Sequence, residues 1–167
     1  YDPLQPFSGL EAHSAFTNTG TMDSTMQSGV DLVRMALRVR WSDLQPVQGG
    51  AIQWEALADF EAELRLMKAA GISPAVVVYS SPLWAVVTRP DDTTSIDGKS
   101  SCGAIATDYF DDFAAFMVEL VKRYSTPEFG VKIWEIGNEV DVDPNLVSAE
   151  SDYGCWGEWN EYYYGGQ

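Results

Sequence analysis

Short runs of β-branched and apolar residues alternate along the chain with longer segments in which apolar residues recur every three or four positions. The first pattern is typical of strands and the second of helices. We expect strands within 9–16, 29–41, 72–79 and 131–141, helices over 54–70 and 108–124, a short helix around 23–28 and a further helix beginning within 159–164. This alternation predicts right-handed crossovers and a parallel sheet, which is the α/β class.

The two long helices carry the clearest patterns. In the first, the apolar stripe consists of Leu57, Phe60, Leu64 and Met67. Charged residues occupy its opposite face, and Gly71 ends it. In the second, the stripe consists of Phe113, Phe116, Met117, Leu120 and Tyr124. We expect both stripes to pack in the core, and we expect strand 29–41 to have an extended or bulged C-terminal end.

The stretch 131–141 reads V-K-I-W-E-I-G-N-E-V-D, an apolar run that stops at Asn138 and Glu139. Such a run is typical of a strand that is buried on both faces of a parallel sheet. In parallel α/β folds the working residues follow the C-terminal ends of the strands, so this pair is a candidate site. Glu135 lies inside the run, where a carboxylate is costly unless paired. We expect it to pair with an arginine on the interior side or to contact substrate.

Composition excludes several classes of protein. The 167 residues are 46% apolar, which predicts a globular domain. A net charge of −15 argues against a nucleic-acid partner, and the absence of an apolar run of membrane-spanning length argues against a transmembrane helix. One histidine, His13, and two distant cysteines cannot supply the four ligands of a structural zinc site. An open flavodoxin-like α/β protein is disfavoured, because no glycine-rich phosphate loop follows the first strand. We expect no cofactor.

An ordered set of short motifs resembles the first half of a clan A glycoside hydrolase, closest to families 39 and 5. The set comprises Gly29-Val30, Val33-Arg34, Trp41-Ser42, Gln45-Pro46, Gly49, Trp54, Gly71, Pro82-x-Trp84-Ala85 and Trp134-Glu135-Ile136-Gly137-Asn138-Glu139. Each motif is short, but their order is fairly specific. The resemblance implies a (β/α)8 TIM barrel, of which residues 1–167 would supply about the first four βα units as the N-terminal half of one catalytic domain.

The resemblance also implies roles for particular residues. Glu139 matches the general acid/base at the end of strand four, and Asn138 matches the residue that holds the sugar 2-hydroxyl. Arg34 matches an arginine near the nucleophile, with Arg38 and Arg40 as rivals because two extra residues precede Trp41. A second departure is Val140, which stands where many members have proline.

The implied activity is retaining hydrolysis of β-glycosidic bonds in an oligo- or polysaccharide, which needs a second carboxylate opposite Glu139. The family takes this nucleophile from strand seven, and the sequence runs only to just after strand four. A half-barrel leaves two sheet edges bare. We therefore expect the C-terminal half of the barrel as a separate polypeptide or a symmetry mate. The alternative is a non-catalytic carbohydrate-binding or scaffold module.

Each of the further candidate residues has two possible roles. Trp84 and Trp41 stand at strand exits, where they either stack on sugar or pack in the protein. His13 is either a subsite residue or a hydrogen-bonded structural one. Cys102 and Cys155 lie in loops, where they form a disulfide or remain two unrelated thiols. A disulfide would support secretion, because such bonds persist in oxidising compartments.

Overall fold

The structure is a computed structural model, and it describes residues 8–12, 24–25, 27–86 and 104–138. The chain divides into two compact units, each of which is described by itself. Unit 1 comprises Tyr1–Val39, Trp54–Val78 and Val118–Ile136. Unit 2 comprises Arg40–Gln53, Tyr79–Met117 and Gly137–Gln167.

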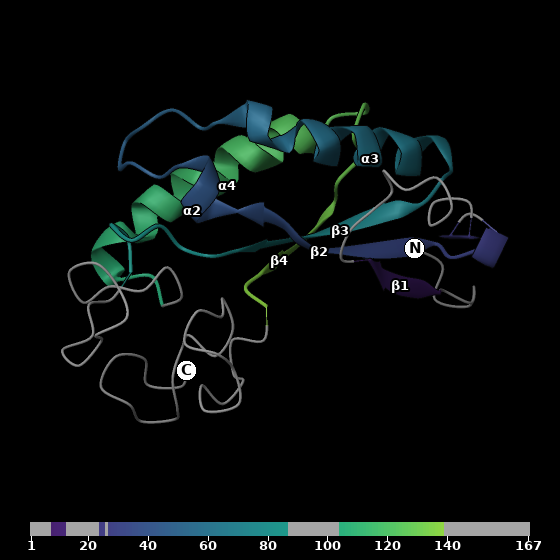
Figure 1. The fold of residues 1–167 in the computed structure, drawn as a ribbon, viewed down its shortest axis with the longest axis horizontal. Helices are drawn as coiled ribbons and strands as arrows, with labels where there is room; N and C mark the ends of the chain where they lie inside the picture. Colours follow the sequence, from purple (N-terminus) through teal and green to yellow (C-terminus); the bar gives the residue numbers. More distant parts are fainter. Residues whose placement is uncertain (1–7, 13–23, 26, 87–103, 139–167) are drawn as a thin grey trace, which may run out of the picture. The chain divides into compact units, whose positions relative to one another are not determined.

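Unit 1 is built on a four-stranded sheet in the order β1-β2-β3-β4 (Figure 1). The strands are β1 (Gly9–Ala12), β2 (Leu32–Arg40), β3 (Ser73–Tyr79) and β4 (Ile133–Ile136). Strand β1 pairs with β2 in parallel, and β3 pairs with β4 in parallel. All four predicted strands are therefore present, and this sheet with its helices fits part of an α/β barrel. The last residues of β2 and β3 belong to unit 2.

Helix α3 (Ala58–Ala69) follows a single 3-10 turn, η1 (Trp54–Leu57). All four stripe residues are buried, so the predicted stripe is confirmed; they are Leu57, Phe60, Leu64 and Met67. The helix ends as expected at Gly71, whose φ of 77° suits a residue without a side chain. The Gly71 amide donates to the Lys68 carbonyl, and the Ile72 amide donates to the Met67 carbonyl.

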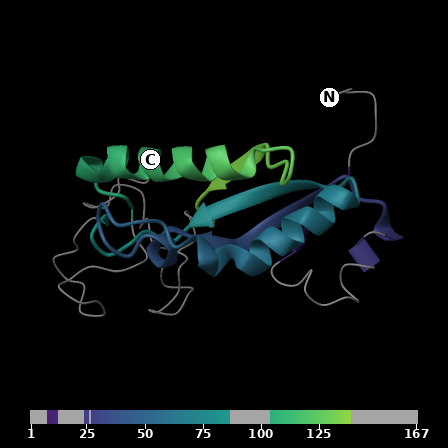
Figure 2. The ribbon, with the colours of Figure 1, turned by 90° about the horizontal axis from the view of Figure 1, so that it is seen from above.

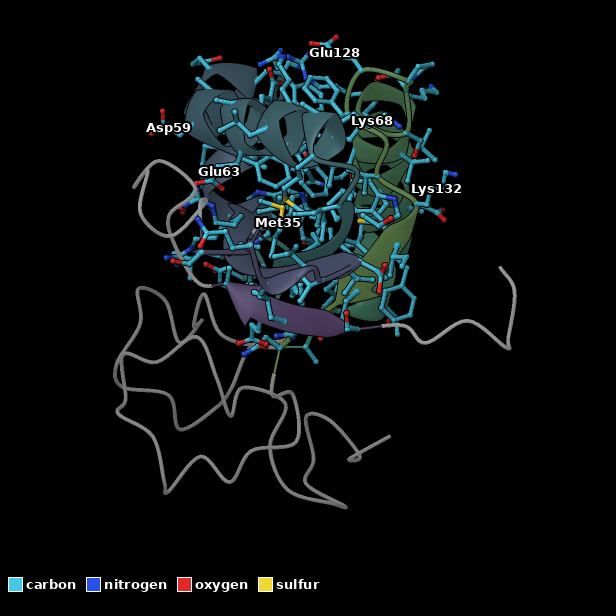
Figure 3. The ribbon with its side chains drawn as sticks, turned by 90° about the vertical axis from the view of Figure 1, so that its right-hand side faces the viewer. Met35, Asp59, Glu63, Lys68, Glu128 and Lys132 are labelled. Atoms are coloured by element: carbon cyan, nitrogen blue, oxygen red, sulfur yellow. The ribbon has the colours of Figure 1, made fainter. Side chains whose placement is uncertain are left out.

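Helix α4 (Phe110–Tyr124) follows the 3-10 turn η3 (Thr107–Tyr109), and its C-terminal part from Val118 belongs to unit 1. This part lies on the same side of the sheet as α3 (Figure 3), and β3 is visible between the two helices in Figure 2. Tyr124 is fully buried at the helix end. Its ring centroid lies 5.4 Å from that of Phe60 and 5.1 Å from that of Phe129, so it joins the two helices.

The inner strand β3 and the outer strand β4 differ in burial. Every residue of β3 after Ser73 is buried, as predicted for an inner parallel strand. In β4, however, Ile133 is 45% exposed and Ile136 is 55% exposed. The expectation that β4 is buried on both faces is therefore wrong. Within the described part of the chain, β4 stands at the edge of the sheet and has β3 as its sole paired neighbour.

Two carboxylates of α3 are also buried, which contradicts the expectation that charged residues fill an exposed face. Glu63 is 1% exposed and accepts hydrogen bonds from Arg38, at 3.1 Å from Nε and 2.7 Å from Nη2. Glu61 is 8% exposed and accepts from Arg123 and from the Tyr124 hydroxyl. Burial, and after it the Glu61 charge, raises the pKa of Tyr124. These arginine partners compensate for the loss of water around each carboxylate.

The Arg38–Glu63 pair generates a stability prediction. In Glu63→Gln an amide group replaces one carboxylate oxygen, and the Arg38 charge loses its partner inside the protein. We expect the free energy of unfolding to fall by about 3 kcal/mol. The matched control is Glu119→Gln, which removes an exposed carboxylate paired with Lys122 and should change the free energy by no more than about 0.5 kcal/mol. Urea denaturation of both variants measures the difference, and equal effects would contradict a structural role for the buried pair.

Candidate functional site

The side of the unit 1 sheet that faces away from the helices carries three charged residues from three strands. Met35 has its side chain between the sheet and the helices (Figure 3), and it is 1% exposed. Because side chains alternate along a strand, the neighbouring Arg34 lies on the other side. Glu11 is paired with Arg34 in the β1–β2 register, and Glu135 comes from β4. Three charged groups therefore meet on the sheet face that forms the interior of an α/β barrel.

Arg34 binds both carboxylates through three nitrogen atoms. Its Nε donates to Glu135 Oε2 at 2.7 Å, and its Nη2 donates to Glu135 Oε1 at 2.5 Å. At the other end of the guanidinium, Nη1 donates to Glu11 Oε2. The pair with Glu135 spans the width of β3, where Val77 is the register partner of Glu135 and is fully buried. The bidentate geometry fixes the plane of the guanidinium and gives the pair directional strength.

The charges of this cluster shift its protonation equilibria. The Arg34 hydrogen bonds lower the pKa of Glu135, and partial burial opposes this shift. Glu135 in turn raises the pKa of Arg34, and Glu11 adds a smaller contribution of the same sign. The three side chains are 25% to 42% exposed, so water screens the cluster only in part. Glu135 therefore stays ionised and paired at neutral pH.

The expected pairing of Glu135 with an arginine is confirmed, and its partner is Arg34. Arg38 instead binds Glu63 of α3, on the helix side of the sheet, although it stands four residues after Arg34. Strict alternation would place the two arginines on the same side, yet the Arg38 guanidinium reaches a carboxylate on the helix side. The expected bulged end of β2 stays a prediction. Arg40, the other rival, belongs to unit 2.

The candidate pair Asn138-Glu139 comes after the end of β4. The strand stops at Ile136, Gly137 adopts a φ of 80°, and Asn138 is half-buried in unit 2. The other candidates fall outside the described residues; they are Glu139, His13, Cys102 and Cys155. Their roles, and the pairing of the two cysteines, remain predictions.

Unit 2 contains the two candidate tryptophans. Trp41 begins α2 (Trp41–Leu44) and is 1% exposed. Its ring stacks against Phe116 at 5.7 Å between centroids and contacts Trp84 edge-on at 5.2 Å. Trp84 is half-buried, and its Nε1 donates to the Gln45 carbonyl at 3.1 Å. Burial favours packing as the role of Trp41, whereas Trp84 keeps part of its surface exposed.

Sequence reasoning missed two features. Glu11 is the second partner of Arg34, and the signal was a carboxylate within a strand, the same signal that singled out Glu135. Ser80 follows β3 and has a φ of 57°, a conformation that residues other than glycine seldom adopt. Its hydroxyl lies 2.9 Å from that of Ser42, and its carbonyl accepts from the Ser42 amide. Serine and proline at positions 80–82 are typical of a loop, but they do not indicate this strained residue.

In the described part of the chain, no group of three or more histidine, cysteine, aspartate or glutamate side chains is placed to hold a metal ion. Across the same residues, every helix falls short of the length and apolar character needed to cross a membrane.

The lowered pKa of Glu135 predicts a pH dependence of stability. Because the carboxyl binds protons more weakly in the folded chain, its contribution is complete above the ordinary pKa of 4.5 and is lost as the pH falls through the lower folded value. Glu135→Gln should therefore cost about 1 kcal/mol of unfolding free energy at pH 7, a modest value for a partly exposed pair, and less at pH 3. Urea denaturation across this pH range measures the difference. A cost that is independent of pH would contradict the ion pair.

Comparisons with known proteins identify the fold. No model of a protein family and no curated protein sequence matches the chain. Among solved structures, a family 39 glycoside hydrolase from the gut symbiont Bacteroides cellulosilyticus WH2 aligns with a TM-score of 0.53 and 20% identity, over 84% of this chain and 25% of that one. A β-galactosidase from the psychrophilic Marinomonas ef1 aligns with a TM-score of 0.56 and 16% identity, over 86% of this chain and 23% of that one. The chain thus spans about a quarter of each neighbour, and what it shares with these glycoside hydrolases is the fold of part of an α/β barrel.

Proposed function

We propose that the chain is part of a retaining glycoside hydrolase that cleaves β-linked oligo- or polysaccharides, with Glu139 as general acid/base. The observation that carries the proposal is the Asn138-Glu139 pair directly after β4, in a fold shared with two glycoside hydrolases. Residues that follow the C-terminal ends of barrel strands form the active sites of such folds. Fold alone does not assign chemistry, so the strand-end carboxylate is the essential part of the argument.

The proposed reaction uses Glu139 twice. As an acid, it protonates the leaving glycosidic oxygen while a second carboxylate attacks the anomeric carbon from the opposite face and forms a glycosyl–enzyme bond. As a base, it then takes a proton from the water that breaks this bond, which regenerates both carboxyl groups. Positioned proton transfer of this kind contributes a factor of about 10² to 10⁴ to the rate.

Other residues take supporting roles in this proposal. Asn138 would hold the sugar 2-hydroxyl, and Arg34 would lie near the nucleophile, as the resemblance implies for both. Trp84 is half-buried and is the candidate on which a sugar would stack, and His13 is the further candidate for sugar contact. Trp41 is left out of the binding set because it is buried.

The nucleophile is proposed to come from further βα units outside the 167 residues, in the same polypeptide, a separate polypeptide or a symmetry mate. Strand β4 supports this part of the proposal, because its edge position and exposed isoleucines, Ile133 and Ile136, suit pairing with another strand. The proposal includes a secreted location, which a disulfide between Cys102 and Cys155 would support.

The test is Glu139→Gln in the complete assembly that hydrolyses a β-glycoside. Gln cannot donate a proton, so turnover of substrates with poor leaving groups should fall by about 10² to 10⁴. Cleavage of an activated aryl glycoside needs no acid, so its glycosyl–enzyme intermediate should still form and then accumulate. Azide needs no general base to attack this intermediate, so it should restore turnover of the activated substrate and yield a glycosyl azide.

The matched control is Glu119→Gln, which changes an exposed helix carboxylate and should leave all these rates unaltered. Unchanged hydrolysis by the Glu139 variant would contradict the acid/base assignment. Saccharide binding without turnover by the unmodified assembly would favour the non-catalytic alternative.

A further inference from the structure

We propose that Glu11 is a positioning residue that, together with Glu135, sets the orientation of the Arg34 guanidinium on the interior face of the sheet. Its effect on the orientation of Arg34 is independent of the proposed function. Its effect on turnover rests on that function, in which Arg34 lies near the nucleophile.

The geometry of the three side chains carries this proposal. Glu135 engages one side of the guanidinium, through Nε and Nη2, whereas Glu11 engages Nη1 at the other end. A bidentate carboxylate alone lets the arginine and its partner move together about their flexible side-chain bonds. A third hydrogen bond from a different strand removes that freedom, because it ties the opposite end of the group to β1.

The anchoring of β1 makes Glu11 a fixed reference point. Glu11 is the register partner of Arg34, so the two side chains start from neighbouring positions of the β1–β2 pair. Just before β1, the Ser8 amide donates to Asp31 Oδ2 at 2.9 Å, and the Ser8 hydroxyl lies 3.2 Å from the same oxygen. The Asp31 and Leu32 amides both donate to the Ser8 carbonyl. Strand β1 is therefore tied to the start of β2 at its N-terminal end, three residues before Glu11.

The charges of the three side chains also support a positioning role for Glu11. One guanidinium lies between two carboxylates, from β1 on one side and β4 on the other. Without the Glu11 charge, Arg34 loses the attraction from the β1 side and keeps the attraction to Glu135, so its N–H groups shift toward β4. Glu11 thus determines where the guanidinium presents its N–H groups, and it does so without contacting the reacting atoms.

The first readout is the rate of rotation about the Nε–Cζ bond of Arg34, from the exchange between its two Nη ¹⁵N signals in the 167-residue chain. Arg34→Lys assigns these signals by their loss. Glu11→Ala should speed the rotation about tenfold, the factor that corresponds to one charge-assisted hydrogen bond. Glu11→Gln keeps a neutral acceptor and should give a smaller increase, while Glu11→Asp should restore most of the slow rotation. Ser8→Ala removes only the contact of the Ser8 hydroxyl with Asp31 and keeps the backbone bonds that anchor β1, so it should leave the rotation unchanged.

The second readout is turnover by the complete assembly that carries each variant. We expect Glu11→Ala to lower kcat at least tenfold with KM changed less than threefold, Glu11→Asp to recover most of the loss, and Ser8→Ala to behave as the unmodified protein. Unchanged Nη exchange in Glu11→Ala would overturn the positioning role, whatever the activity. Faster exchange with unaltered kcat in an active assembly would overturn its importance for turnover. Absence of hydrolysis by the unmodified assembly would contradict the proposed function instead, and the NMR result would still decide the orientation of Arg34.

Discussion

An arginine on an inner strand of a parallel sheet is partly removed from water, so it needs carboxylates within reach of its side chain. Arg34 meets this constraint with Glu11 and Glu135, which come from β1 and β4. The bond between Arg34 and Glu135 joins β2 and β4, which are not neighbours in the sheet. The cluster lies on the side opposite Met35, away from the helices. One side of the unit 1 sheet therefore packs against α3 and the C-terminal part of α4. The other side carries the paired charges of Arg34, Glu11 and Glu135, which lie across β3.

Most of unit 1 follows from patterns that are local in the sequence. The stripe from Leu57 to Met67 has helical spacing and is buried as expected, and the β-branched run of β3 forms the buried inner strand. Gly71 ends its helix because the left-handed conformation there disfavours a side chain. A carboxylate inside an apolar strand demanded a partner, which predicted that Glu135 binds an arginine.

The failed expectations depend on partners that are distant in the sequence. Glu61 and Glu63 border the apolar stripe of α3, and Arg123 and Arg38 reach them from α4 and β2, so they are buried. The isoleucines of β4 are typical of a buried strand, yet they are exposed, because burial depends on neighbours that the local sequence does not encode. At the candidate site, the resemblance selected Arg34 as the main candidate, and the hydrogen-bond partners of the two arginines distinguish it from Arg38. Glu11 carried the same signal as Glu135, a carboxylate within a strand, but its pairing with Arg34 required the strand register.

In the proposed mechanism, Glu139 works with a second carboxylate about 5 to 5.5 Å away, a separation that leads to retention of anomeric configuration. Proton NMR of the first sugar product released from a β-linked substrate by the complete assembly, recorded before mutarotation, tests this mechanism. The β-anomer should appear first. Initial appearance of the α-anomer would contradict the mechanism, because inversion requires carboxylates about 6.5 to 9.5 Å apart with a water molecule between the sugar and the base.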